Sequence, residues 1–506
     1  MQEQEPDVSS THPPICLVHA LLAANLKRPC SSGAAKKADT LYLRAASALG
    51  LVTPDMRCPL SWESEEAQTS DGAVPGEPLG KVKLWGITIL SQYTSLLDFV
   101  KQQHRASEHF SYDYRRDLNE SAALLIKHLR DVRERHGCSA QVVCHSMGCL
   151  IALSALHAEP DLFHSVLFAG GNFAGGAGFY PWNTNGRSVG LNSRLMRAEV
   201  MHTWPSLYQG ASPELNDPAL KRADGKDLFQ FIEMEAWLER GERVVVPIDF
   251  YSIDHWQKFR LGPWHLGAKR PVSAEMRAHV ERCLRLGRQF QASMRNARPA
   301  GEYPPVASLV GRGHTTPDFL LWSVSKSRWV PWTKHLLRCR PISVDSTQPM
   351  DGSISAISAA APHGVPSTEY VAQYNAPGMG AHRTLLSEVE LVAQILRDLE
   401  ATAAGRNAAV GPAATDAAAA DVSIRLSEKS LMEPSISIRA TPNTSPDAMQ
   451  RDRRRVLGDK RVSRASLSLV SPAPASRKAW RVLRTVAQAS ASFASVLDSP
   501  LHNRKL

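Results

Sequence analysis

Short apolar runs alternate with amphipathic helical patterns from about Pro14 to about Glu400. Continuous apolar runs are typical of strands buried on both faces, and apolar residues three and four positions apart are typical of helices. Their alternation predicts an α/β fold, with a mostly parallel sheet and helices on both faces. Strands are expected at 15–22, within 109–118, and at 141–146, 164–171, 304–313 and 367–377, and helices between 118 and 137, at 149–158 and at 385–399.

Two changes of pattern divide the chain. Between about Phe173 and Arg298, Trp, Pro and polar clusters interrupt the regular pattern, which predicts a cap inserted into a sheet domain of residues 14–400. Residues 401–450 are rich in Ala, Ser, Thr and Pro with little periodicity, so a disordered linker is expected there. Residues 1–13 are expected to be a flexible N-terminus, and residues 451–506 a basic tail.

The composition is that of a globular protein, with 43% hydrophobic and 21% charged residues. No apolar run reaches the roughly 18 residues of a transmembrane helix, and the start of the chain lacks the basic and apolar stretches of a secretory signal. The eight cysteines lack the spacing of metal ligands. We therefore expect reduced thiols, no metal or organic cofactor, and an intracellular protein that is cytoplasmic or peripheral on membranes.

The net charge of +10 is concentrated in the tail, where thirteen Lys and Arg outnumber three Asp and Glu. Apolar residues at roughly helical spacing lie in the same segment: Trp480, Leu483, Val486, Phe493 and Leu497. Such a segment favours peripheral contact with an anionic membrane, and a solvated disordered tail is the alternative interpretation. Nucleic-acid binding is not expected, because the basic cluster lacks a recognisable fold and interleaved aromatic residues.

A nucleophile elbow with one substitution lies at residues 144–148, between an expected strand and an expected helix. In such a turn a strained backbone projects the serine hydroxyl above the sheet, and small residues two positions away on either side allow the sharp bend. Gly148 is one of these, and Cys144 stands where the other glycine is usual. The motif predicts Ser146 as a catalytic nucleophile.

A serine nucleophile needs a base to take its proton, and in this fold the base follows the last strand. His382 lies between the last expected strand and the last expected helix. It is therefore the expected base. His363 and His314 are rivals, interpreted as loop or surface residues.

The carboxylate that orients the base should lie between the strand at 304–313 and the histidine. Three aspartates satisfy this order: Asp318, Asp345 and Asp351. Asp351 is the expected acid, because it opens an Asp-Gly turn ahead of a short β-like run. Asp254 falls within the predicted cap and is interpreted as structural.

The oxyanion of an acyl-transfer intermediate needs preorganised amide donors. One should be the backbone N–H of Met147, directly after the nucleophile, and the other should come from the loop after the first strand, near Leu21. His19, in the same loop, is interpreted as shaping the loop rather than as a second base.

Six segments, taken in order, make the chain from about Pro14 to Leu399 resemble the lecithin:cholesterol acyltransferase-like family, which includes lysosomal phospholipases and phospholipid:diacylglycerol acyltransferases. They are PICLVHALLAANL (opening strand and oxyanion loop), SYDYRRDL (its YDWR), VCHSMG (its AHSMG), LFAGGNFAGG (its GAPWGG), VGRGHTTPD (its YGTGxPTPD) and MDGSISAISA (its GDGTV).

This resemblance implies an α/β-hydrolase fold with Ser146, Asp351 and His382 as the triad and the amides of Leu21 and Met147 as oxyanion donors. It also implies a serine-dependent acyl hydrolase or O-acyltransferase, with a lipid or another acyl ester as substrate. The alternative is a catalytically silent scaffold that keeps the fold.

The chain departs from the family's pattern at three places. His19-Ala20 replaces Pro-Gly before the oxyanion donor, Cys144 replaces Ala or Gly in the elbow, and Met350 replaces the Gly before the acid. The change at Ala20 bears on the donor loop, and therefore on catalytic efficiency more than on reaction class.

Overall fold

The computed structural model describes most of the chain between residues 12 and 409. The described ranges are 12–28, 39–84, 87–175, 179–210, 230–242, 244–265, 271–312, 319–324, 328–330, 354, 356–362, 364–373 and 381–409. The predicted linker beyond residue 409, the basic tail at 451–506 and residues 1–11 of the N-terminus lie outside them.

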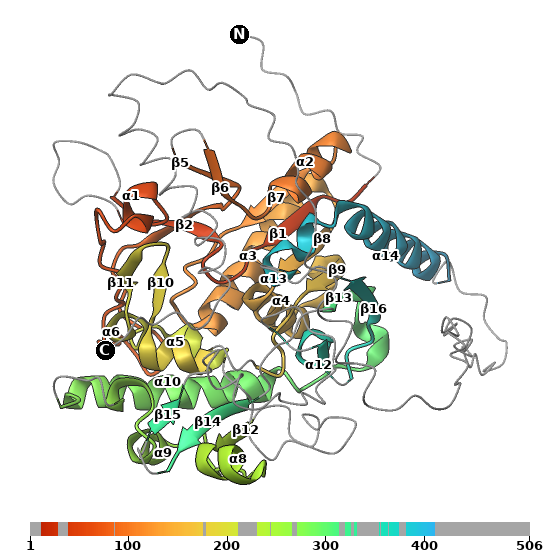
Figure 1. The fold of residues 1–506 in the computed structure, drawn as a ribbon. Helices are drawn as coiled ribbons and strands as arrows, with labels where there is room; N and C mark the ends of the chain where they lie inside the picture. The colour runs from red at the N-terminus through yellow and green to blue at the C-terminus, as the bar shows by residue number, and fades with distance from the viewer. Residues whose placement is uncertain are drawn as a thin grey trace, which may run out of the picture. The chain divides into compact units, whose positions relative to one another are not determined.

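A sheet of six described strands forms the centre of the fold, in the spatial order β16-β13-β9-β8-β1-β7 (Figure 1). Each neighbouring pair is parallel. Parallel neighbours require crossover connections, which bury both faces of the sheet under helices. The strands are β1 (Ile15–Val18), β7 (Ser107–Phe110), β8 (Ala140–His145), β9 (Phe163–Ala169), β13 (Val306–Arg312) and β16 (Thr368–Gln373).

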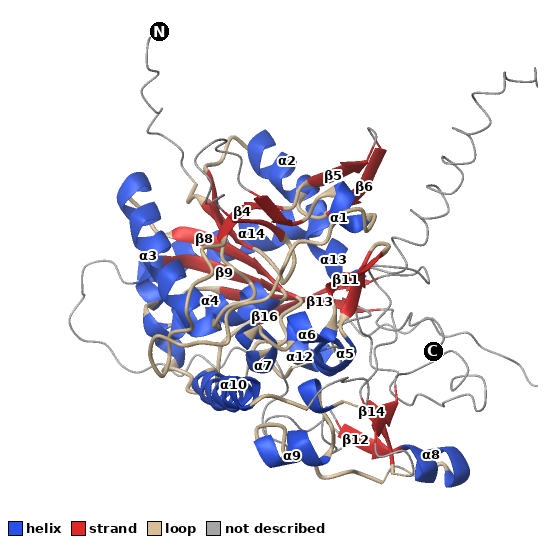
Figure 2. Ribbon diagram, turned by 90° about the vertical axis from the view of Figure 1, so that its left-hand side faces the viewer, coloured by secondary structure: helices blue, strands red, loops and turns tan. Residues whose placement is uncertain are grey.

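Helices cover the two faces of this sheet (Figure 2). On one face α3 (Leu118–His136) and α4 (Met147–Ala158) pack with alternate residues of β1, Cys16 and Val18. On the other face α2 (Thr94–Gln102) and α14 (Val389–Ala409) pack with Ile15 and Leu17. Because successive strand residues point to opposite faces, a continuously apolar strand serves both cores.

Two stretches of chain add smaller sheets. Between β1 and α2 lie an antiparallel sheet of order β3-β2-β4 and the hairpin β5–β6, which the hydrophobic pattern did not predict. Their strands are short, and those of the antiparallel sheet are partly exposed, so they lack the continuous apolar runs of the central strands. The elements are β2 (Ala24–Arg28), β3 (Asp39–Tyr42), α1 (Ala45–Ala48), β4 (Val74–Pro78), β5 (Lys81–Leu84) and β6 (Ile87–Ser91).

The region predicted as a cap contains a hairpin, several short helices, one long helix and β12, which belongs to a sheet of order β12-β14-β15. That sheet is built from two parts of the chain, because β14 and β15 follow β13. Trp256, Phe250 and Trp322 are in its separate apolar core. The elements are α5 (Phe179–Asn185), β10 (Arg187–Val189), β11 (Asn192–Met196), α6 (Ala198–Met201), α7 (Pro205–Gln209), β12 (Gln230–Glu233), α8 (Met234–Arg240), α9 (Ile253–Lys258), η3 (Gly262–Trp264), α10 (Ala274–Ser293), β14 (Phe319–Ser323) and β15 (Arg328–Val330).

The end of the described chain differs from the sequence-based expectation. The predicted final helix, 385–399, is the short η5 (Leu385–Ser387) followed by α14, which continues to Ala409. The first residues of the predicted linker, 401–409, are therefore helical, as their alanine content favours. The remaining elements are η1 (Pro160–Leu162), η4 (Ala300–Glu302), α12 (Ala356–Ala359) and α13 (Ala381–Thr384).

The parallel sheet, the crossover helices and the sharp turn between β8 and α4 make this an α/β-hydrolase fold, as predicted. Of the helices that the structure describes, none has both the length and the hydropathy to cross a bilayer.

Candidate active site

Ser146 occupies the turn between β8 and α4 with a strained backbone, at φ 54° and ψ −122°. A non-glycine residue at positive φ persists only where its surroundings hold it. Here the N–H of Ser146 donates to the carbonyl of Ala169 at 2.9 Å, and its carbonyl accepts from the N–H of Cys149 at 2.9 Å. These bonds hold the serine at the carboxyl edge of the sheet, which is the geometry of a nucleophile elbow.

The two small residues of the elbow, Gly148 and Cys144, lie in different surroundings. A Cβ on Gly148 would lie 2.6 Å from the carbonyl oxygens of both His19 and Val18, so only glycine fits there. Cys144 is fully buried, and its thiol donates to the carbonyl of Leu167 at 3.2 Å. Burial raises the pKa of this thiol well above its usual value, which keeps it protonated. A cysteine thus fits where glycine is usual.

His382, on α13, faces the elbow. Its Nε2 lies 2.9 Å from Oγ of Ser146, close enough for the hydroxyl to donate to the imidazole. Gly170, with φ 58°, lies beside the ring, and a Cβ on it would be 3.0 Å from His382 Nδ1. The structure thus brings together the predicted nucleophile and the predicted base. The rival histidines, His314 and His363, lie outside the described residues.

The loop after β1 approaches the first turn of α4. The Gly148 contacts place the backbone at Val18 and His19 against that turn. The N–H of Met147 begins α4, so the helix itself offers it no carbonyl partner, and the helix dipole favours an anion there. Leu21 lies in the turn of the loop, which makes its amide the candidate for the second donor.

His19 shapes this loop with both ring nitrogens. Its Nδ1 donates to the carbonyl of Ala20 at 2.8 Å, and its Nε2 accepts from the N–H of Tyr112 at 3.3 Å. The ring stacks on Tyr112 with centroids 4.2 Å apart. Burial lowers the pKa of His19 to about 4, so the ring is neutral near pH 7. These contacts agree with a loop-shaping role.

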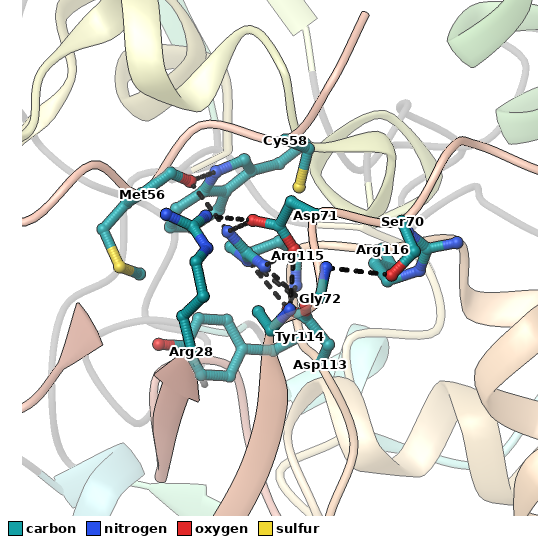
Figure 3. A network of polar contacts seen from close by, with 12 residues as sticks. Arg28, Met56, Cys58, Ser70, Asp71, Gly72, Asp113, Tyr114, Arg115 and Arg116 are labelled. Carbon is teal, nitrogen blue, oxygen red and sulfur yellow. Dashed lines mark hydrogen bonds and ion pairs between the residues drawn. The ribbon is translucent and has the colours of Figure 1, made fainter. Parts of the chain in front are cut away.

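Figure 3 shows a buried ion-pair network around Arg115, which follows Tyr112 closely in the sequence. The fully buried guanidinium donates to Asp113 at 2.7 Å, to Asp71 at 3.0 Å and to the carbonyl of Met56 at 3.3 Å. Arg28 is also paired with Asp71. The network ties the segment before β4 to the segment after β7.

The carboxylate of the predicted triad is outside the described residues, as are the rival positions Asp318 and Asp345. Asp351 therefore stays a prediction. The short β-like run expected after it is wrong, because residues 356–359 form the helix α12, which their alanine content favours. Asp254 lies on α9, in the region predicted as a cap, and is largely exposed, 3.6 Å from Arg277.

Sequence reasoning assigned no role to three residues at this site. Gly170 gives His382 its space, and its only signal was a Gly-Gly pair after a strand. His145 lies inside the elbow motif and was passed over for the serine beside it. Tyr93, whose hydroxyl lies 3.0 Å from His145 Nδ1, had no sequence signal at all.

No protein-family model and no curated protein sequence matches the chain. Three solved structures are similar. The Tle4–Tli4 complex is similar at 11% identity and TM-score 0.48, over 77% of this chain and 99% of that one. The mature Bacillus licheniformis lipase BlEst2 is similar at 11% identity and TM-score 0.33, over 79% and 96%. A DBJA deletion mutant is similar at 12% identity and TM-score 0.22, over 62% and 87%. Likenesses this distant do not bear on reaction or substrate, and the acyltransferase-like family stays a prediction.

Proposed function

We propose that this protein is a serine-dependent acyl hydrolase or O-acyltransferase that acts on ester-linked acyl groups of lipids. The observation that carries the proposal is the 2.9 Å approach of His382 Nε2 to Oγ of Ser146, on a strained strand-to-helix turn. A hydroxyl held against an imidazole in this way is the activated nucleophile of covalent catalysis.

The reaction would proceed through an acyl-serine. His382 takes the proton of Ser146 as Oγ bonds to the ester carbonyl carbon, and the carbonyl oxygen becomes an oxyanion. The amides of Met147 and Leu21 hold that oxyanion, each donor contributing roughly 3–4 kcal/mol in comparable sites. His382 then returns the proton to the departing alcohol as the carbon–oxygen ester bond breaks. Asp351 is the proposed partner of the imidazolium.

The second half-reaction decides between hydrolysis and transfer. Water or an alcohol attacks the acyl-serine, His382 accepts the attacker's proton, and Oγ of Ser146 regains it on release. Both outcomes use the same residues, so they differ only in the acceptor that reaches the site. Lipid as the substrate class rests on the six motif resemblances in the sequence.

The proposal is tested by acyl release from vesicles of mixed phospholipid and neutral glyceride, with and without an alcohol acceptor. We expect activity in the wild-type protein and a loss of about 10⁶-fold, to background, in Ser146→Ala. The matched control is Ser154→Ala, on the same helix and half-buried, which should retain activity. The product distinguishes water from alcohol as the acceptor.

Covalent labelling with a fluorophosphonate gives a second readout. Wild-type protein should be labelled at Ser146 and the Ser146→Ala variant should not. If folded wild-type protein neither releases acyl groups nor is labelled, the protein is a silent scaffold and the enzymatic proposal is wrong.

A further inference from the structure

Three hydrogen bonds connect the oxyanion loop, the elbow and the base in one continuous chain. The N–H of Ala20 donates to the Tyr93 hydroxyl oxygen at 2.9 Å. That hydroxyl lies 3.0 Å from Nδ1 of His145, and Nε2 of His145 lies 2.8 Å from the backbone carbonyl of His382. Tyr93 and His145 are fully buried.

The direction of each bond follows from its ends. A carbonyl oxygen only accepts, so Nε2 of His145 carries the proton toward His382. Burial disfavours a charged imidazole, so the other nitrogen of the fully buried His145 carries no proton and accepts from the Tyr93 hydroxyl. Burial raises the pKa of Tyr93, which keeps its hydroxyl protonated for this role. The hydroxyl oxygen accepts from Ala20. All three bonds therefore point the same way.

The ends of the chain are places where position matters for the reaction. Ala20 directly precedes Leu21, the proposed second oxyanion donor. His382 is the proposed base, and it is held here by its backbone carbonyl while its Nε2 faces Ser146. His145 directly precedes Ser146 in the elbow. One neutral chain thus reaches three parts of the site that come from distant segments of sequence.

We propose that Tyr93 and His145 are positioning residues, which hold the oxyanion loop and the loop of His382 in register with Ser146. This inference rests on the proposed function. The two side chains do not touch substrate; they act through Ala20 and through the main chain of His382. Misplacement of a reacting group by about 1 Å can cost roughly 10²-fold in rate. A buried chain of satisfied bonds restricts such movement, because each broken bond leaves a buried polar group unpaired.

The variant Tyr93→Phe removes the hydroxyl and keeps the ring. We expect kcat for acyl release to fall roughly 10- to 100-fold, with KM changed by less than about threefold, because geometry at the reacting atoms is lost and the substrate surface is kept. The rate of fluorophosphonate labelling of Ser146 should fall in parallel.

Tyr303→Phe is the matched control. The hydroxyl of Tyr303 also accepts from a backbone N–H, that of Arg298 at 2.9 Å, and this side chain is 1% exposed. It precedes β13, at the amino edge of the sheet, whereas Ser146 follows β8 at the carboxyl edge. We expect a similar loss of thermal stability and an unchanged kcat. Equal loss of kcat in both variants would mean general destabilisation and would overturn the inference.

A second pair of variants tests His145. His145→Ala removes the donor to the His382 carbonyl, whereas the amide of His145→Gln can supply one. We expect the glutamine variant to recover part of the kcat that the alanine variant loses, at matched KM. Equal kcat in the alanine variant and the wild type would overturn the inference.

The outcomes separate the inference from the proposed function. If wild-type protein is neither active nor labelled, both are wrong. If wild-type protein is active and Tyr93→Phe matches its kcat and its labelling rate, only the positioning role is wrong.

Discussion

Two buried polar networks lie near the carboxyl edge of the central sheet, and they differ in charge. The network around Arg115 is ionic and joins Asp71, from before β4, to Asp113, from after β7. The chain from Ala20 through Tyr93 and His145 to His382 is made of neutral groups. The first network holds the segment before β4 against the segment that follows β7 of the central sheet. The second ends at the backbone of Ala20 and of His382, and we propose that it positions the groups that react.

The largest expected effect comes from breaking the ionic network. Arg115→Met keeps much of the side-chain volume but leaves the buried carboxylate of Asp113 without its guanidinium partner, and leaves the partly buried Asp71 paired with Arg28 alone. Removing one partner of a buried pair costs about 3–5 kcal/mol in free energy of unfolding. Urea unfolding at pH 7 measures this loss.

The control for Arg115 is an ion pair in the same part of the chain that is exposed. Arg57 contacts Asp55 at 2.6 Å, with 55% and 49% of the two side chains exposed. Arg57→Ala should lower the free energy of unfolding by no more than about 1 kcal/mol. If Arg115→Met costs as little, burial does not set the strength of the ionic network.

The second-largest expected effect comes from crowding the ring of His382, the proposed base. Gly170→Ala places a Cβ 2.7 Å from Cδ1 of Leu385 and 3.0 Å from Nδ1 of His382, at a left-handed backbone position. We expect a backbone strain of about 1–2 kcal/mol and a fall in kcat of roughly 10²-fold as the imidazole shifts. Chemical denaturation and steady-state acyl release measure the two quantities.

Gly137→Ala is the control for Gly170, because Gly137 is also left-handed, at φ 68°, and has open space around its added Cβ. It should show the left-handed backbone strain without the crowding, and a normal kcat. A normal kcat in Gly170→Ala as well would show that the ring of His382 tolerates the crowding.

The smallest effect is the pH dependence of stability, which should differ between His19, in the loop after β1, and the ionic network. The folded pKa of His19, beside the neutral chain, is lowered by burial from 6.5 to about 4. The unfolded chain therefore binds the proton first as pH falls, and stability is lost between pH 6.5 and about 4. Between pH 6.5 and 5.5 the contribution of His19 to the free energy of unfolding should fall by about 1 kcal/mol.

The ionic network fails in a lower window. Burial opposes ionisation of Asp71, but hydrogen bonds and charge from Arg115 outweigh it, so the pKa is lowered from 3.8. Its stabilisation is present above pH 3.8 and is lost as pH falls through the folded pKa.

Urea unfolding at several pH values measures the window of His19. Above pH 4, the free energy of unfolding should change less steeply with pH in His19→Asn than in the wild type. Equal slopes would show that His19 does not cause the loss of stability between pH 6.5 and about 4.

Much of the fold was predictable because its signals are local. Strand periodicity, helix periodicity and the turn chemistry of residues 144–148 are each contained in a short window of sequence, and the order of elements then places Ser146 and His382 at one sheet edge. The same reasoning missed the sheet of β12, β14 and β15, because β12 pairs with β14 across a long separation in sequence. Asp351 remains a prediction from chain order, the Asp-Gly turn and the family resemblance.

The sequence by itself determined the strand–elbow–helix unit, because the turn chemistry of residues 144–148 is local, and with the order of elements it predicts Ser146 and His382 as nucleophile and base. The lack of room at Gly148 comes from the carbonyls of Val18 and His19, which only the tertiary structure brings to the elbow. Only the tertiary structure decided which distant groups support the site. Tyr93 meets His145 across 52 residues, and Arg115 meets Asp71 across 44. Such pairings depend on how separate segments pack against the sheet, and no periodicity within either segment encodes its partner.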